Sequence, residues 1–431
     1  MAGDGLYLAA SQILRKVCEG KGAVRTLCYS SSIQNKKALY ALVLETARHL
    51  HLLKHIIKEA DWLKMANRST KALPKNIKRV DEFLAAVLLQ DFLFTEQLKC
   101  SPEVQKIVES SKARLRAEKV KAQLLFRREG RPEGMTADDE EAQVPRYVRI
   151  NRCLVPDSQI ASIISRLSGS LNLPETQIVA DLHVKDLLVL PPGTDLTGNQ
   201  LYRENLIILQ DKASCFPPVI LNPPSGAQVI DACAAPGNKT SQLCALVGPE
   251  GRVWAFERDT RRFQTLEKLT SAAGVGGRLR NKLADFLTVD PKDPEFAHVT
   301  HILCDPSCSG SGMPMSLERG LSTQEGQQSF DQQRLVQLSK FQCMIVKHAM
   351  KFPSVQRVVY STCSIHAQEN ENVVAEVLRD CPEFGLVQRI LPEWPRRGLP
   401  DFSFAEDVIR ADSKLDRMNG FFVALFERKR E

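Results

Sequence analysis

The chain of 431 residues is 43% hydrophobic and 25% charged, with a formal net charge of +7. This length exceeds one ordinary domain and predicts two or three folded units, each able to bury a core. The sequence has no run of about 18 apolar residues, and its first residues lack the basic-then-apolar pattern of a secretory signal, so we expect neither a membrane span nor secretion.

Residues 1–130 predict a helical, basic domain. Apolar residues recur at helical spacing around Leu39, Leu42 and Val43, and a second apolar block begins at Phe83. The segment holds 24 Lys and Arg against 13 Asp and Glu, a net charge of +11 that leaves −4 for the rest of the chain. This asymmetry favours a partner with a phosphate backbone, although the same charges would equally suit solvated helix faces.

Residues 131–144 have the composition of a linker, with glycine and proline followed by the acidic run 138–141. From 145 to 222 the pattern changes to short strand-like runs, such as 146–150 and 187–190, which indicate a second, small subdomain. From 223 to 431 apolar strands alternate with helical stretches, as expected for an α/β domain with a mostly parallel sheet. The expected strands are 229–230, 253–256, 302–304 and 358–360, and the expected helices are 240–247, 261–273 and 332–350. Ligands of such sheets bind at the carboxyl ends of the strands.

The most informative segment is 231–240, DACAAPGNKT, directly after a predicted strand. Its small residues and its Pro236-Gly237 step allow the backbone to pass close to a ligand at a strand-to-helix turn. The segment is neither the Gly-x-Gly-x-x-Gly dinucleotide signature nor a P-loop. Acidic residues follow three successive strands of the same domain, as Glu257, Asp285 and Asp305. Together these features indicate a nucleoside ligand that carries ribose and adenine without phosphates.

The twelve cysteines include no Cys-x-x-Cys pair, which argues against zinc and disulfides and favours reduced thiols in the cytosol or nucleus. We expect no metal site. Inert packing is the interpretation for Cys18, Cys28, Cys100, Cys153, Cys215, Cys244, Cys343 and Cys381.

Cys308 and Cys363 differ, because each lies among small and polar residues in a loop after a predicted strand. Carbon 5 of cytosine is methylated only after a thiolate attacks carbon 6, and a second group must then remove the carbon-5 proton. Two thiols at adjacent strand ends match that need, but spacing alone does not decide their roles.

The segments DACAAPGNKT, DPSCSGSG (305–312) and YSTCSI (360–365), in this order, resemble the Sun-domain family of RNA cytosine-5 methyltransferases. The resemblance covers roughly 145–428 and includes Arg-x-Asn at 149–151, Gln-Asp-x-Ala-Ser at 210–214 and a closing strand at 420–424. It implies a Rossmann-like, seven-stranded α/β methyltransferase sheet in 223–431. It also implies an α+β RNA-recognition subdomain in 145–222, and S-adenosyl-L-methionine as cofactor.

The resemblance also separates the two thiols. It implies that Cys363 is the nucleophile and that Cys308 assists release of the product. Asp305 and Lys239 lie where the target base would be oriented, and a nearby ammonium would favour the Cys363 thiolate. The positions that match the family's cofactor site are Cys233, Ala234, Ala235, Pro236, Gly237, Asn238, Lys239, Glu257, Arg262, Asp285 and Asp305.

The sequence departs from the family pattern at two positions, because Asn238 replaces a usual Gly and Glu257 a usual Asp. Asn tolerates unusual backbone angles and Glu keeps the acceptor, so we expect the chemistry to survive. Asn238 and N-terminal segments such as 39–43 resemble the fifth subfamily, which implies large-subunit ribosomal RNA as partner, a nucleolar location and a monomer.

Two rival functions remain to be weighed. An amino-group methyltransferase would need Asp/Asn-Pro-Pro-Tyr after the fourth strand, where this chain has Asp305-Pro306-Ser307-Cys308. The second rival is a catalytically minor, RNA-binding ribosome-assembly factor. Such a protein is expected to have lost a thiol or the cofactor loop, and both are present.

Overall fold

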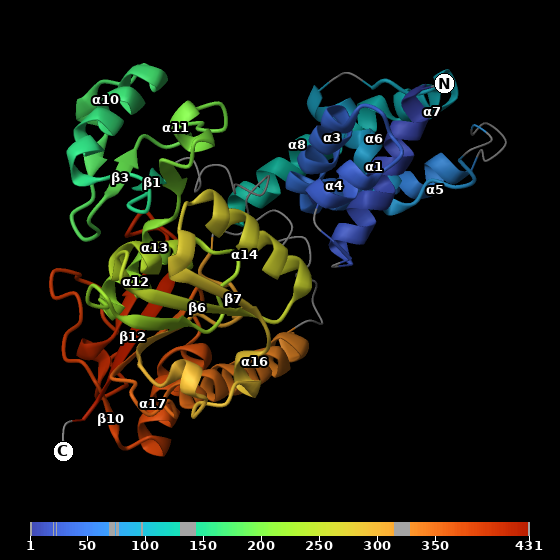
Figure 1. Cartoon of the computed structure of the whole chain (residues 1–431). Coiled ribbons are helices and arrows are strands. Elements are labelled where there is room, and N and C mark those ends of the chain that lie inside the picture. Colours follow the sequence, from blue (N-terminus) through green and yellow to red (C-terminus); the bar gives the residue numbers. More distant parts are fainter. Residues whose placement is uncertain are drawn as a thin grey trace. The chain divides into compact units, whose positions relative to one another are not determined.

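The computed structural model describes residues 2–19, 21–22, 24–68, 74, 77–95, 98–129, 144–313 and 328–429. Two compact units are present, and each is described by itself. One comprises 1–139 and 315–327, and the other 140–314 and 328–431 (Figure 1). Nearly all of the expected linker, 131–144, lies outside the described residues. None of the described helices is long and apolar enough to cross a membrane.

The first unit is helical in all of its described elements. The apolar helix α6 lies in the core, with residues 84–89 all buried, and packs against α1, α3 and α4. The side chains of Asn35 and Asp81 accept hydrogen bonds at the N-termini of α3 and α6 and thereby cap these helices. The elements are α1 (Ala2–Cys18), α2 (Val24–Ser30), α3 (Lys36–Arg48), α4 (Leu50–Glu59), α5 (Trp62–Asn67), α6 (Glu82–Gln90), the π-helix η2 (Asp91–Thr95), α7 (Pro102–Ser110) and α8 (Lys112–Arg128).

The second unit begins with a small antiparallel sheet of strand order β2-β3-β1-β4. Its elements are β1 (Arg146–Ile150), α10 (Ile160–Leu171), β2 (Val179–Ala180), β3 (Leu187–Leu190), α11 (Gln200–Arg203) and β4 (Ile207–Leu209). The predicted runs 146–150 and 187–190 are therefore strands, and they pair with each other. Ile163 and Leu167 on α10 pack into the same core as Val148 and Leu188, so the helix covers this sheet.

The large sheet has seven strands in the order β10-β12-β9-β8-β5-β6-β7, and an eighth, β11, pairs with β12. Strands β5 to β9 are parallel, whereas β12 runs antiparallel to β9. The Rossmann-like fold class is confirmed, with β11 added to the seven expected strands. The strands are β5 (Gln228–Asp231), β6 (Arg252–Glu257), β7 (Leu279–Leu283), β8 (Val299–Cys304), β9 (Arg357–Thr362), β10 (Phe384–Leu386), β11 (Ile409–Ala411) and β12 (Phe421–Arg428).

Helices cover both faces of this sheet (Figure 1). Alternate residues along a strand enter opposite cores, and on β5 Val229 belongs to one and Ile230 to the other. The helices α12 (Lys212–Leu221), α13 (Asn238–Val247) and α14 (Thr260–Ala272) pack on the first face, and α16 (Gln328–Ala349) and α17 (Glu371–Asp380) on the second.

The Arg-x-Asn signature joins the small sheet to the large one. Arg149, 2% exposed, donates from Nη2 to Ser241 Oγ over 2.8 Å and from Nε to Gln210 Oε1 over 2.8 Å. Asn151 Nδ2 donates to the carbonyl of Ala273 over 2.9 Å. Polar groups that are buried and bonded in this way hold two elements in one geometry. The signature thus fixes the small sheet against α13 and the end of α14, beside the segment 231–240.

Candidate active site

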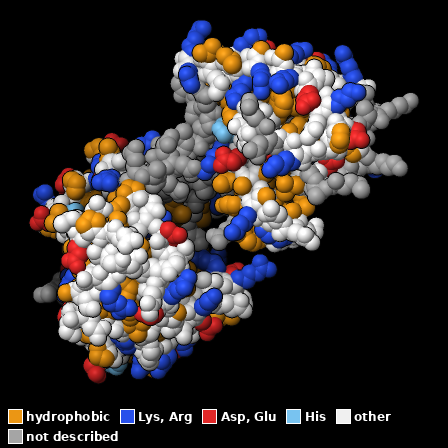
Figure 2. Space-filling view, turned by 90° about the horizontal axis from the view of Figure 1, so that it is seen from above, with side chains coloured by type: hydrophobic (Ala, Val, Ile, Leu, Met, Phe, Trp, Pro, Cys, Tyr) orange, Lys and Arg blue, Asp and Glu red, His pale blue; other side chains and the backbone are white. Residues whose placement is uncertain are grey.

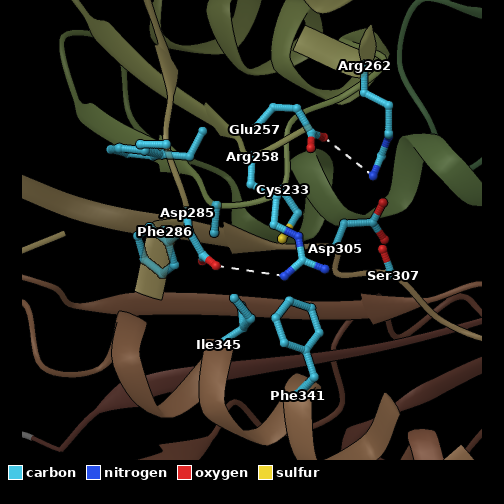
Figure 3. A pocket seen from close by; sticks show the side chains of 13 residues that line it. Cys233, Glu257, Arg258, Arg262, Asp285, Phe286, Asp305, Ser307, Phe341 and Ile345 are labelled. Atoms are coloured by element: carbon cyan, nitrogen blue, oxygen red, sulfur yellow. Dashed lines mark ion pairs between the residues drawn. The ribbon is translucent and has the colours of Figure 1, made fainter. Parts of the chain in front are cut away.

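A pocket with an empty volume of about 390 Å³ lies at the carboxyl ends of β5 to β8 (Figure 3). Strand order reverses between β5 and β8, and at such a switch point the loops on either side diverge and leave a crevice. The residues that line it are Ala232, Cys233, Phe256, Glu257, Arg258, Arg262, Ala284, Asp285, Phe286, Asp305, Ser307, Phe341 and Ile345. Five of the predicted site residues are among them, namely Cys233, Glu257, Arg262, Asp285 and Asp305.

The remaining predicted cofactor residues, 234–239, follow Cys233 and form the turn into α13. Gly237 has φ +115°, a conformation that favours glycine, and a Cβ there would crowd Thr270 Cγ2 at 3.0 Å. Asn238 is the first residue of α13 and has no positive φ. The proposed tolerance of Asn for unusual backbone angles is therefore the wrong explanation for Asn238. Its amide instead donates to the carbonyl of Leu209 in the small sheet over 3.4 Å, a bond that glycine cannot make.

Two carboxylates of the pocket each have an arginine beside them (Figure 3). Glu257 Oε2 lies 3.4 Å from Arg262 Nη1, and Arg262 Nη2 donates to the carbonyl of Ala235 over 2.8 Å. Asp285 Oδ2 lies 3.7 Å from Arg258 Nη1, and the Arg258 guanidinium also lies over the ring of Phe341. The acids at the ends of β6 and after β7 thus face one space, as the register of parallel strands predicts.

Several pocket residues carried no recognisable sequence signal. Phe341 and Ile345 stand one helical turn apart on α16, far along the chain from any motif. Together they form an apolar side of the pocket, across from Glu257, while Phe286 lies beside Asp285 (Figure 3). Asp231, the first residue of the segment 231–240, lies beneath this pocket segment, is fully buried, and burial raises its pKa to about 7. Thr240 Oγ1 donates to its Oδ2 over 2.8 Å, and among the described residues no group bonds its Oδ1.

Lys239 and Asp305 form an ion pair at the edge of the pocket. Lys239 Nζ lies 2.7 Å from Asp305 Oδ2, and Ser361 Oγ at the end of β9 donates to Asp305 Oδ1 over 2.6 Å. Burial alone would lower the pKa of Lys239, but the charge and hydrogen bond of Asp305, with Asp231 and Cys363 adding to them, raise it. Lys239 is therefore an ammonium held in place by Asp305.

The structure brings the two predicted thiols together. Cys308 Sγ lies 3.0 Å from Cys363 Sγ, although 55 residues separate them in sequence. The hydrogen bond to the Cys363 sulfur, followed by burial, raises the pKa of Cys308 far above its ordinary value. The raised pKa keeps Cys308 in its thiol form, in hydrogen-bonding contact with the Cys363 sulfur. Cys304, which had no predicted role, is buried in the core at the end of β8.

Comparison with known proteins matches three families along the chain. Residues 218–427 match the family described as 16S rRNA methyltransferase RsmB/F. Residues 37–129 and 144–210 match the N-terminal and ferredoxin-like domains of NOL1/NOP2/Sun domain family member 5. The fold also resembles a methyltransferase homolog protein from Pyrococcus horikoshii, with a TM-score of 0.54 and 22% identity over 68% of this chain and 89% of that one. An NSun6 structure from Pyrococcus horikoshii with SFG gives a TM-score of 0.52 at 15% identity, over 68% of this chain and 94% of that one.

Curated relatives are similar over almost the whole chain. The 28S rRNA (cytosine-C(5))-methyltransferase of Mus musculus is 38% identical over 98% of this chain and 91% of its own length. The 25S rRNA (cytosine-C(5))-methyltransferase rcm1 of Schizosaccharomyces pombe is 35% identical over 99% of this chain and 92% of its own length. With the pocket, the ion pair and the two thiols in place, the chain belongs to the Sun-domain family of S-adenosylmethionine-dependent RNA cytosine-5 methyltransferases.

Proposed function

We propose that this protein methylates carbon 5 of a cytosine in large-subunit ribosomal RNA through a covalent bond between Cys363 Sγ and carbon 6. The observation that carries the proposal is the meeting of two thiols 3.0 Å apart beside the Lys239–Asp305 pair, at the edge of the pocket. The substrate class is supported by the names of relatives, which act on 28S, 26S and 25S rRNA.

The pocket fits S-adenosylmethionine, which supplies an activated methyl group. Glu257 and Asp285 offer carboxylate oxygens to ribose hydroxyls and to an adenine amino group, respectively. Phe286, Phe341 and Ile345 give apolar surface for a flat ring. The small residues at 232–235 let the backbone approach the ligand closely. These residues would bind and orient the cofactor.

The chain's own groups then act on the base. The Lys239 ammonium favours the thiolate form of Cys363, which adds to carbon 6 while the pair of electrons of the carbon 5–carbon 6 double bond moves towards carbon 5. Asp305 is held by Lys239 and Ser361 and orients the exocyclic amine and ring nitrogen of the cytosine. Carbon 5 becomes nucleophilic only in this adduct.

Release requires the carbon-5 proton to leave. Once the Cys363 sulfur is bonded to carbon, it no longer holds the thiolate charge that keeps Cys308 protonated. Cys308 therefore ionises more easily in the adduct than in the free enzyme and can accept that proton. The electron pair of the broken C–H bond restores the double bond, and the carbon–sulfur bond breaks to return the Cys363 thiolate.

RNA affinity is the proposed role of the helical unit. On α8 the side chains of Lys112, Arg114, Arg116, Lys121, Arg127 and Arg128 are exposed, while Leu115, Ala122 and Phe126 are buried. One face of the helix thus carries the core contacts and the rest presents cations to solvent. We propose the division 1–130 for RNA or ribosome binding, 131–144 as linker, 145–222 for RNA recognition and 223–431 for catalysis, with action in the nucleolus.

Bisulfite sequencing tests the reaction and its target together. Total RNA is compared from cells with and without the gene, and from cells that express only Cys363→Ala. A protected cytosine in large-subunit rRNA should be present with the gene and absent in the other two. If the pattern of protected cytosines is the same in all three, the proposed function is wrong.

A further inference from the structure

The loop that carries Cys308 is bonded on both sides of the cysteine to residues outside the segments 305–312 and 360–365. Ser309 N–H donates to Glu369 Oε1 over 2.9 Å. Gln342 Nε2 on α16 donates to the same oxygen over 2.9 Å and to the carbonyl of Ser307 over 3.1 Å. Glu369 and Gln342 thus hold the backbone immediately before and after Cys308.

Glu369 is itself placed rigidly. It ends the 3-10 helix η8 (Ala367–Glu369), and its backbone carbonyl accepts a hydrogen bond from the Tyr360 hydroxyl of β9 over 2.5 Å. Both Glu369 and Gln342 are 0% exposed. Within the described part of the chain, Glu369 Oε2 and Gln342 Oε1 have no hydrogen-bond partner. Burying polar atoms without partners costs free energy, and an apolar pair would pack here without that cost. Their presence beside the thiols therefore indicates that Glu369 and Gln342 serve to position the loop.

A second set of contacts ties the same loop to the Cys363 segment. The hydroxyls of Ser309 and Ser311 each lie 3.2 Å from Ser364 Oγ. Gly312 N–H donates to the carbonyl of Cys363 over 2.9 Å, and Gly420 N–H donates to the carbonyl of Gly312 over 2.6 Å. A Cβ on Gly312 would clash with the carbonyl oxygen of Gly420. These contacts fix one end of the loop, and Glu369 with Gln342 fixes the part that carries the sulfur.

We propose that Glu369, held by Gln342, is a positioning residue for product release, because it keeps the Cys308 sulfur against Cys363. The inference rests on the proposed role of Cys308 in release. Without the Glu369 acceptor, the Ser309 N–H and its loop are free to move away. Attack by Cys363 and methyl transfer do not use Cys308, whereas removal of the carbon-5 proton does.

The experiment measures, for each full-length variant with RNA and S-adenosylmethionine, the ratio of covalent protein–RNA adduct to released methylated RNA. Glu369→Leu keeps the bulk but removes the acceptor, and we expect the ratio to rise at least about 10-fold, since a misplacement near 1 Å can cost about 10²-fold. Gln342→Leu should raise it less. Glu369→Gln keeps an acceptor oxygen and should restore most of the wild-type ratio. The double variant Cys308→Ala/Glu369→Leu should accumulate no more adduct than Cys308→Ala.

Val377→Ala is the matched control, because Val377 is a fully buried residue of α17 in the adjoining core without a bond to the loop. It should lower adduct and product in proportion to the loss of folded protein. If Cys308→Ala accumulates adduct but Glu369→Leu shows the wild-type ratio, the inference alone is overturned. If Cys308→Ala accumulates no adduct while wild type is active, the proposed role of Cys308 in product release is wrong, and so is the inference that rests on it.

Discussion

The helical unit and the α/β unit bury different kinds of side chain. In the described part of the helical unit the buried polar residues are Asp4, Ser11, Thr46, Gln90 and Ser111, and Asp4 is the one acid among them. The α/β unit buries Arg149, Lys212, Asp231, Glu257, Glu369 and Glu371. The cations of α8 lie outside, in contact with solvent (Figure 2 shows lysine and arginine scattered over one face of the molecule).

This contrast fits the proposed roles of the two units. A phosphate backbone is bound from the surface by mobile cations, so the core beneath them can be apolar. A reacting base needs charges that are fixed and shielded from water, which requires buried ion pairs and hydrogen bonds that reduce stability. Glu257 in the pocket and Glu369 beside the Cys308 loop are buried charges of this kind.

The largest effect is expected from the two thiols of the α/β unit, because the proposed reaction forms and breaks its covalent bond there. Cys363→Ala should form no adduct and transfer no methyl group. Cys308→Ala should attack and methylate, and then remain as a conjugate that resists denaturing gels. Each variant is incubated with total RNA and S-adenosylmethionine, and a ribonuclease-sensitive, slow-migrating band is sought. A band from Cys363→Ala and none from Cys308→Ala would reverse the two roles.

The next effect concerns the buried ion pair. Asp305→Ala leaves Lys239 without its 2.7 Å partner and removes the acceptor that we propose for the base. We expect activity to fall by about 10²-fold or more, as for the loss of one preorganised electrostatic group.

Calorimetry with S-adenosylmethionine or its demethylated product measures cofactor binding to the pocket directly. A folded wild-type protein that gives no binding heat with either compound would show that the pocket is wrongly assigned.

A smaller effect is expected from the surface charges of the helical unit. Replacing Arg114, Arg116, Arg127 and Arg128 by Gln should weaken RNA binding and flatten its salt dependence. The log–log slope should fall by about 0.7 for each single-strand phosphate that is no longer neutralised. The matched control replaces four exposed cations of the α/β unit, Lys268, Arg280, Lys292 and Lys351. Equal reductions in affinity from both sets would mean that the α8 cations are ordinary solvated charges.

The smallest effect is expected from the buried carboxyl group of Asp231, which should change how stability depends on pH. Burial raises the folded-state pKa of Asp231 to about 7, against about 3.9 in an unfolded chain, so the folded state binds an extra proton between these values. The contribution of Asp231 to the free energy of unfolding of the α/β unit should therefore fall as pH rises from about 4 to about 7, with a slope of roughly 1 kcal/mol per pH unit. Asp231→Asn should flatten this slope. Hydrogen exchange in 144–313 of the full chain measures the free energy of unfolding of both proteins, with 2–129 as the internal control. Equal slopes for wild type and Asp231→Asn would contradict the prediction.

The sequence predicted the residues with proposed chemical roles better than the residues that line the pocket. Strand-end acids, the turn at Gly237 and both thiols were recognisable as candidates from residue type and position after a strand, and the family resemblance then separated the roles of the two thiols. Phe341 and Ile345 were missed, since they reach the pocket from a helix that folds back over the sheet. Glu369 and Gln342 were missed for the same reason, because a buried hydrogen bond between distant segments leaves no periodic pattern.

What the sequence by itself determined is therefore the fold class, the cofactor loop and the pair of cysteines. Only the tertiary structure decided that their sulfurs lie 3.0 Å apart, that Lys239 is paired with Asp305, and that Asn238 reaches the small sheet. The physical reason is that strand and helix patterns arise from local periodicity. Distances between side chains on different strands instead depend on register, twist and packing, which the whole core sets together.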